Sequence, residues 1–178
     1  MDTEAATLLF AFLAVSAELA VLAAVVLAVA GRWSPTVAAW RRELATWVGP
    51  DALRLACVVA AVCTAGSLYL SEVANFRPCF LCWVQRGFMY PLVLLLAIAA
   101  WRRAYRTGIV LAGVAVLGGT VSVYHILVER FPTLESSACD PTNPCSLIWV
   151  ERFGYLTIPT MALSGFALIA VLALAARP

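Results

Sequence analysis

The sequence predicts an all-α integral membrane protein with five transmembrane helices. Its composition requires a bilayer, because 63% of the 178 residues are hydrophobic and 12% are charged, whereas a soluble domain is usually about 25% charged. Apolar stretches of about 20 residues, the length that spans the hydrocarbon core, recur along the chain. The expected spans are 6–30, 53–73, 83–101, 108–128 and 155–176. The net charge of +2 gives no indication of nucleic-acid binding, and the absence of lysine excludes Schiff-base and P-loop-lysine chemistry.

The first span is expected to be retained in the membrane rather than cleaved as a signal peptide. Its leader, "MDTEAA", is acidic, and its apolar run is too long for a signal sequence. The next segment, "SPTVAAWRRELATWVG", suits either an interfacial amphipathic helix or a cytoplasmic linker. Ser34 and Pro35 are typical of a helix start, and the following tryptophans and leucine recur at helical spacing beside two arginines.

The placement of arginine predicts the orientation of the chain. Arginines gather between spans one and two, between spans three and four, and at the C-terminal end. They are Arg32, Arg41, Arg42, Arg54, Arg102, Arg103, Arg106 and Arg177. The positive-inside rule makes these segments cytoplasmic. The N-terminus and the segments 74–82 and 129–154 then face outward, and each of these two segments carries two cysteines.

Two of the six cysteines lie inside the second span and are expected to be packing residues. Helical geometry places Cys57 and Cys63 on different faces, so they cannot bond to each other. In the second outward segment, Cys139 and Cys145 flank the turn-rich stretch "DPTNP". This pair suits either a structural staple or a strained, exchangeable disulfide. No metal site is expected, because the surroundings resemble no zinc module.

The sequence "RPCFLCWVQR" places a Cys-x-x-C where an outward segment enters the third span. Helix N-termini and nearby cations favour the reactive thiolate, so Cys79 and Cys82 suit redox chemistry. Arg86 lies one turn deeper on the face of Cys82. At that depth it is either a functional residue or an arginine that snorkels to the headgroups. His125, near the outer end of the fourth span, is expected at a similar depth, either as a core residue or as part of this site.

Few other features interrupt the spans. Glu18 lies within the first span and has no evident partner. Gly118 and Gly119 offer a small face for close helix packing. Pro91 and Pro159 are expected to kink their helices.

Residues 53–176 resemble the DsbB family of disulfide bond formation proteins, and most closely its short-loop BdbC-type branch. The resemblance rests, in order, on "SEVANFRPCFLCWVQRGFMYPL", "YH", "C…PCS" and "FGYLTIPTMALSGFALI". It implies a four-helix transmembrane bundle in a prokaryotic plasma membrane. Here the bundle region, 53–178, is preceded by a segment, 1–52, that adds one N-terminal transmembrane helix and the arginine-rich stretch.

The resemblance also implies an activity, that of a thiol:quinone oxidoreductase. Members of the family reoxidise an extracytoplasmic thioredoxin-like thiol oxidase, DsbA-like or BdbD-like, and pass two electrons to the membrane quinone pool, either ubiquinone or menaquinone. The Cys-x-x-C would be the quinone-linked pair, with its second cysteine nearest the ring, and the loop cysteines would face the partner. By matched position, the catalytic residues would be Cys79, Cys82, Cys139 and Cys145, and the quinone-binding residues would be Arg86 and His125.

Two departures and two alternatives accompany this resemblance. The segment before residue 53 lies outside the four-helix pattern, and the interval from Cys139 to Cys145 is short, so the loop rearrangements of long-loop members do not transfer. Vitamin K epoxide reductase-like enzymes also combine two cysteine pairs with a quinone, but their loop pair precedes the Cys-x-x-C, whereas here it follows. A non-enzymatic membrane scaffold with a structural disulfide loop would need neither Arg86 at depth nor an exchangeable pair.

Overall fold

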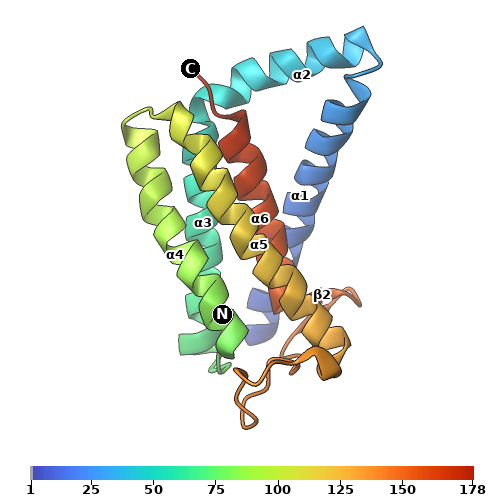
Figure 1. Cartoon of the computed structure of the whole chain (residues 1–178), viewed down its shortest axis with the longest axis vertical. Helices are drawn as coiled ribbons and strands as arrows, with labels where there is room; N and C mark the ends of the chain where they lie inside the picture. Colours follow the sequence, from blue (N-terminus) through green and yellow to red (C-terminus); the bar gives the residue numbers. More distant parts are fainter. Residues whose placement is uncertain (1) are drawn as a thin grey trace.

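The computed structural model describes residues 2–178, and nearly all of the regular structure in it is helical (Figure 1). The α-helices are α1 Thr3–Ala30, α2 Pro35–Val48, α3 Ala52–Leu68, α4 Phe80–Trp101, α5 Gly108–Arg130 and α6 Ile158–Ala175. The short elements are η1 Gly49–Asp51, η2 Tyr69–Val73, η3 Tyr105–Thr107, η4 Pro132–Leu134, β1 Glu151–Arg152 and β2 Leu156–Thr157. Within the described residues, five helices are long and apolar enough to cross a membrane, which confirms the predicted fold class.

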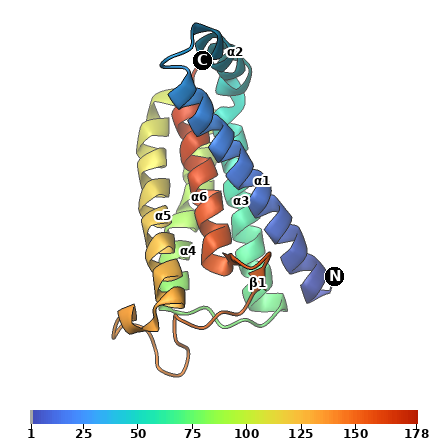
Figure 2. The ribbon, with the colours of Figure 1, turned by 90° about the vertical axis from the view of Figure 1, so that its right-hand side faces the viewer.

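Helices α3, α4, α5 and α6 pack around one apolar core, and α1 lies against α6 on the outside of this bundle (Figure 2). Leu92 and Leu96 of α4 are fully buried against Phe166 and Ile169 of α6. Helices α5 and α6 approach closely because Gly118 has no side chain: a Cβ atom there would lie 2.4 Å from the Phe166 ring. This contact agrees with the small-residue face expected on the fourth span.

The two ends of the bundle differ in composition. At one end, here called the arginine end, α2 lies across the bundle beside the C-terminus (Figure 1). The Val37 amide donates a hydrogen bond to the Ser34 hydroxyl oxygen over 3.4 Å, so this segment is a capped helix, and its interfacial position stays a prediction. Trp40 and Trp47 are exposed on α2. The opposite end, here called the cysteine end, carries the segments 74–82 and 129–154, which the arginine placement predicts to face outward.

The last span begins later than the sequence predicts. Tyr155 belongs to a turn and Thr157 to β2, so α6 starts at Ile158. Pro159 lies in the first turn of α6, where its fixed φ and missing N–H suit a helix start. The expected kink at Pro159 is therefore wrong. The prolyl residue Pro91 lies inside α4, which continues on both sides of it.

A hairpin at the cysteine end connects the second outward segment to α6. Strand β1 pairs antiparallel with β2, and the connecting Phe153 and Gly154 both have positive φ, 53° and 76°. Phe153 is not a glycine, so this backbone needs support from its surroundings. The Phe153 ring meets Phe12 of α1 edge to face, with the ring centroids 5.6 Å apart. The Arg152 guanidinium donates a hydrogen bond to the Thr7 hydroxyl over 2.8 Å.

Helix α1 also makes polar contacts with the segment from the hairpin to α6. The Glu18 carboxylate, for which the sequence suggests no partner, accepts hydrogen bonds from the Tyr155 hydroxyl at 2.7 Å and the Ser164 hydroxyl at 2.9 Å. Together with the contacts of Phe12 and Thr7, these bonds attach the added helix to the end of the second outward segment. Helix α1 therefore braces the hairpin.

Candidate redox site

The Cys-x-x-C pair forms the first turn of α4. Cys79 is the N-cap residue, and its sulfur accepts a hydrogen bond from the Cys82 amide over 3.4 Å. The two sulfur atoms are hydrogen-bonded 3.1 Å apart, and both cysteines are free thiols in this structure. Cys79 is buried and Cys82 is half-buried. The pair therefore stands at a helix N-terminus, where backbone N–H groups favour a thiolate.

The surroundings of Cys79 stabilise its negative charge. The hydrogen bond with the Cys82 thiol lowers the pKa of the Cys79 thiol most strongly, burial opposes this effect, and the hydrogen bond and positive charge of His125 lower the pKa further. The thiolate is the species that attacks disulfides and other electrophiles. Cys79 is therefore the residue of this pair that the protein prepares as a nucleophile.

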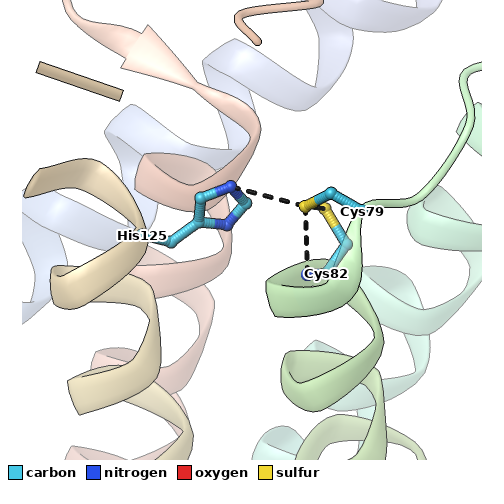
Figure 3. Close-up of side chains that lie close together, drawn as sticks. All are labelled: Cys79, Cys82 and His125. Carbon is cyan, nitrogen blue, oxygen red and sulfur yellow. Dashed lines mark hydrogen bonds between the residues drawn. The ribbon is translucent and has the colours of Figure 1, made fainter. Parts of the chain in front are cut away.

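His125 of α5 is brought directly to this pair (Figure 3). Its Nε2 lies 3.6 Å from the Cys79 sulfur and 3.0 Å from the Cys145 carbonyl oxygen. Its Nδ1 lies 2.9 Å from the side-chain nitrogen of Gln85. With 3% of its surface exposed, His125 is both a buried core residue and a neighbour of the thiols. Its proposed role toward a quinone stays a prediction.

The loop cysteines lie against the Cys-x-x-C. Cys139 and Cys145 are joined by a disulfide with an S–S distance of 2.08 Å. Both are buried in one apolar cluster with Cys79, and Cys82 packs against this cluster. The Asn143 side chain, within the turn between the loop cysteines, donates a hydrogen bond to the Pro78 carbonyl over 3.2 Å. The fold thus places the two pairs in contact although about 60 residues separate them in the chain.

An acidic residue supports the loop disulfide. The Glu135 carboxylate accepts hydrogen bonds from the Cys145 amide and from the Ser146 hydroxyl. One of its oxygens lies within 4.8 Å of the sulfurs of both Cys139 and Cys145. The loop pair is therefore held at its second cysteine by a charged group near the protein surface.

Arg86 faces α3, where it binds Ser67. Its Nε donates to the Ser67 hydroxyl over 2.9 Å, and its Nη2 donates to the Ser67 carbonyl over 2.8 Å. The Tyr90 hydroxyl lies 3.4 Å from the Ser67 hydroxyl, and the Trp83 ring covers the guanidinium at 5.0 Å. With 9% of its surface exposed, Arg86 is held against α3 inside the bundle, and its role toward a quinone stays a prediction.

Sequence reasoning missed several polar neighbours of the site. Gln85 is the only glutamine of the chain and follows Cys82 by three residues, a helical spacing that could have indicated it. Glu129 follows His125 by four residues and is also buried, and its Oε2 has no hydrogen-bond partner among the described residues. No sequence pattern indicated Ser67, because its contact with Arg86 depends on how α3 and α4 pack.

Two groups of side chains at the site contain three potential metal-binding residues each. One is Cys79, Cys82 and His125, and the other is Glu135, Cys139 and Cys145. A closed structural zinc site uses four ligands, and the second group has both its sulfurs in a disulfide. Neither group is therefore a complete structural zinc site.

Comparison with known proteins identifies the family. A sequence profile described as "Disulfide bond formation protein DsbB" matches residues 50–176, which is more than half of the chain. The chain belongs to the DsbB family. The DsbB-family match includes α3 to α6 and both cysteine pairs, whereas α1 and α2 precede it.

The DsbB-family relatives are bacterial disulfide formation proteins. "Disulfide bond formation protein C" of Bacillus subtilis strain 168 is 41% identical over 115 residues, covering 64% of this chain and 83% of that protein. "Probable disulfide formation protein C 1" of Bacillus anthracis is 42% identical over 112 residues, which cover 62% of this chain and 80% of that protein. "Probable disulfide formation protein" of Oceanobacillus iheyensis is 42% identical over 125 residues, which cover 67% of this chain and 84% of that protein. No solved structure matches the chain significantly. The vitamin K epoxide reductase-like alternative has no support among these matches.

Proposed function

We propose that this DsbB-family chain is a thiol:quinone oxidoreductase. It takes two electrons from a reduced extracytoplasmic thioredoxin-like thiol oxidase and passes them to a membrane quinone. The observation that carries this proposal is the contact between the two cysteine pairs. The Cys139–Cys145 disulfide and the Cys79 and Cys82 thiols share one buried cluster, and His125 touches a residue of each pair.

The electrons move as pairs through disulfide exchange. A reduced partner attacks Cys139, leaves as a disulfide, and converts Cys139 and Cys145 to thiols. The loop thiols then reduce a Cys79–Cys82 disulfide and regain their own. The arrangement in this structure, with a loop disulfide beside two free thiols, corresponds to the stage after this second exchange.

The last step needs an acceptor within the membrane. A bound quinone supplies that chemistry, because it accepts two electrons and two protons. The residues beside Cys82 fit such a group: the Arg86 guanidinium is a buried, oriented cation, and the Trp83 ring is 59% exposed on the outer surface of α4. Arg86 would donate a hydrogen bond to a ring oxygen and stabilise negative charge there. Either ubiquinone or menaquinone satisfies this requirement.

The proposal includes an orientation, with the redox cysteines on the extracytoplasmic face of a prokaryotic plasma membrane. It is supported by the eight arginines expected on the cytoplasmic side, several of which flank α2 at the arginine end. Thiol labelling tests this orientation. Intact cells and inverted vesicles are mildly reduced and then treated with a membrane-impermeant thiol reagent. We expect Cys139 to be labelled in intact cells. Labelling of Cys139 from the cytoplasmic face alone would reverse the orientation and remove the proposed partner.

Thiol trapping in liposomes tests the activity itself. The purified protein receives a reduced DsbA-like oxidase, with or without ubiquinone or menaquinone, followed by acid quenching and alkylation. Both cysteine pairs should cycle, and sustained oxidation of the DsbA-like protein should require quinone. A variant that lacks the other two cysteines, with Cys57→Ala and Cys63→Ala, is the matched control and should behave like the unchanged protein. Pairs that never change redox state would support the scaffold alternative.

A trapped complex tests the entry point of the electrons. In Cys145→Ala, Cys139 has no intramolecular partner, so its mixed disulfide with the oxidised DsbA-like protein cannot be resolved from within the loop. Non-reducing electrophoresis with peptide mapping should place this adduct at Cys139. An adduct found only at Cys79 would mean that the electrons enter at the other pair.

A further inference from the structure

The buried polar side chain of Gln85 has no role in the proposed route of the electrons. Gln85 is 7% exposed and belongs to the same turn of α4 as Arg86, but it faces α5, where its amide nitrogen lies 2.9 Å from His125 Nδ1. We propose that Gln85 is a positioning residue that keeps the N–H of His125 on Nε2, the nitrogen that faces both cysteine pairs.

The protonation of His125 follows from its neighbours. A carbonyl oxygen can only accept a hydrogen bond, so the 3.0 Å contact between His125 Nε2 and the Cys145 carbonyl requires a proton on Nε2. A neutral imidazole then has a lone pair on Nδ1, and the Gln85 amide N–H₂ satisfies that lone pair. The Nε2 proton also faces the Cys79 sulfur, 3.6 Å away.

A glutamine serves both protonation states of the imidazole. When His125 gains a second proton on Nδ1, rotation of the Gln85 amide presents its oxygen as an acceptor at the same place. Gln85 therefore supports a neutral or a cationic His125 without moving the ring, and Nε2–H stays directed at Cys79. An apolar side chain would leave the cation with a buried, unsatisfied N–H, which is unfavourable.

Other charged groups surround the cluster and have to be held constant in any test. Helix α4 contributes Cys82 and Arg86, and helix α5 contributes Glu129 and Arg130. The second outward segment contributes Glu135, at the Cys145 amide. Among the described residues, the Gln85 side chain bonds to His125 and to none of these charged groups, so substitutions at residue 85 act on Cys79 through His125.

The inference rests on the proposed function, because it treats Cys79 as a reacting thiolate, but its test needs neither partner nor quinone. Iodoacetamide alkylates Cys79, and the rate of this reaction is measured as a function of pH. Mass spectrometry first verifies that the Cys139–Cys145 disulfide of the protein is intact. We expect Gln85→Leu to raise the midpoint of this profile by about one pH unit, the equivalent of one hydrogen bond to a charged group. Gln85→Glu, which favours the imidazolium, should lower the midpoint.

Opposite shifts from two substitutions at one position separate positioning from packing. Loss of packing alone would move both midpoints in the same direction or leave both unchanged, and either result would overturn the proposal. Both shifts should disappear in a His125→Ala background, and shifts that survive there would also overturn it. Ser122→Ala is the matched control, since Ser122 is a buried polar residue of α5 whose hydroxyl, among residues 2–178, bonds only to the Gly118 carbonyl, and it should leave the midpoint unchanged.

Discussion

The two cysteine pairs touch each other but are built in different ways. Cys79 and Cys82 lie at the start of α4, and the pKa of Cys79 is lowered most by the hydrogen bond with Cys82 and further by His125, which is fixed on α5. Cys139 and Cys145 belong to a turn-rich segment, and their closest charged neighbour, Glu135, comes from the same segment. The first pair has a prepared thiolate, and the second, although its sulfurs are buried, lies in a loop whose residues 136–138 and 140–142 are exposed. The difference suggests a division of work in which one pair performs chemistry at the membrane and the other meets a soluble protein.

Substitution of single cysteines tests this division and has the largest expected effect. With dithiothreitol as a small reductant and quinone as the acceptor, Cys79→Ser should reduce quinone only at the background rate, because the membrane-side pair is lost. Cys139→Ser should retain activity with dithiothreitol and lose it with a reduced DsbA-like protein. Ultraviolet absorbance of the quinone measures both rates. Equal loss with both reductants in Cys139→Ser would show that the pairs do not divide the work.

Removal of the Arg86 guanidinium should affect only the reaction of the Cys79–Cys82 pair with quinone. Arg86→Ala is expected to slow quinone reduction by about 10²–10³-fold, the usual effect of removing one fixed electrostatic donor. Arg86→Lys should recover part of the rate, since lysine lacks the planar fork that bonds Ser67. The rate of exchange between the loop disulfide and the DsbA-like protein, measured by thiol trapping, should stay unchanged. Arg102→Ala, at an exposed position of the arginine end, is the matched control.

The pH dependence of alkylation should distinguish the Cys-x-x-C from ordinary thiols. Alkylation requires a thiolate, and the Cys82 hydrogen bond and His125 lower the pKa of Cys79. Alkylation of Cys79 should therefore persist as the pH falls below about 8.5, the ordinary thiol pKa, and decrease only when the pH passes the lowered value. The same peptide in urea-unfolded protein should show the ordinary profile. Identical profiles in the folded and unfolded protein would remove the evidence for a prepared thiolate.

The smallest expected effect concerns the brace that α1 provides. Glu18→Gln weakens the bonds to Tyr155 and Ser164, and such interhelical bonds contribute on average about 0.6 kcal/mol in membranes. Reaction of the loop pair with the DsbA-like protein should slow by at most about eightfold, the equivalent of losing both bonds, while dithiothreitol-driven quinone reduction should not change. Ser16→Ala is the control on the same helix, because the Ser16 hydroxyl donates to the Phe12 carbonyl within α1 and has no other bond in the described part of the chain. A larger effect on the dithiothreitol reaction would assign α1 to the membrane-side pair instead.

The features that sequence could predict depend on residues close together in the chain. The spans follow from continuous apolar stretches, the start of α2 follows from Ser34 and its neighbours, and the cysteine pairs follow from short spacings. The features that it could not predict depend on helix packing. The contact of Gln85 with His125 requires the register of α4 against α5, and the contact of Arg86 with Ser67 requires the register of α4 against α3. The hairpin was missed because its strands have two residues each, too few to show an alternating pattern.

The bonds of Glu18 have a consequence for the biogenesis of the protein. Their two partners, Tyr155 and Ser164, follow Glu18 by 137 and 146 residues, so they emerge from the ribosome long after Glu18 does. Until then the nascent chain carries an unsatisfied acid within its first span, at a cost on the order of a few kcal/mol. Helix α1 is therefore made well before it acquires these two polar contacts. A chain whose synthesis stops before α6 keeps that acid exposed to lipid, which distinguishes it from a finished molecule.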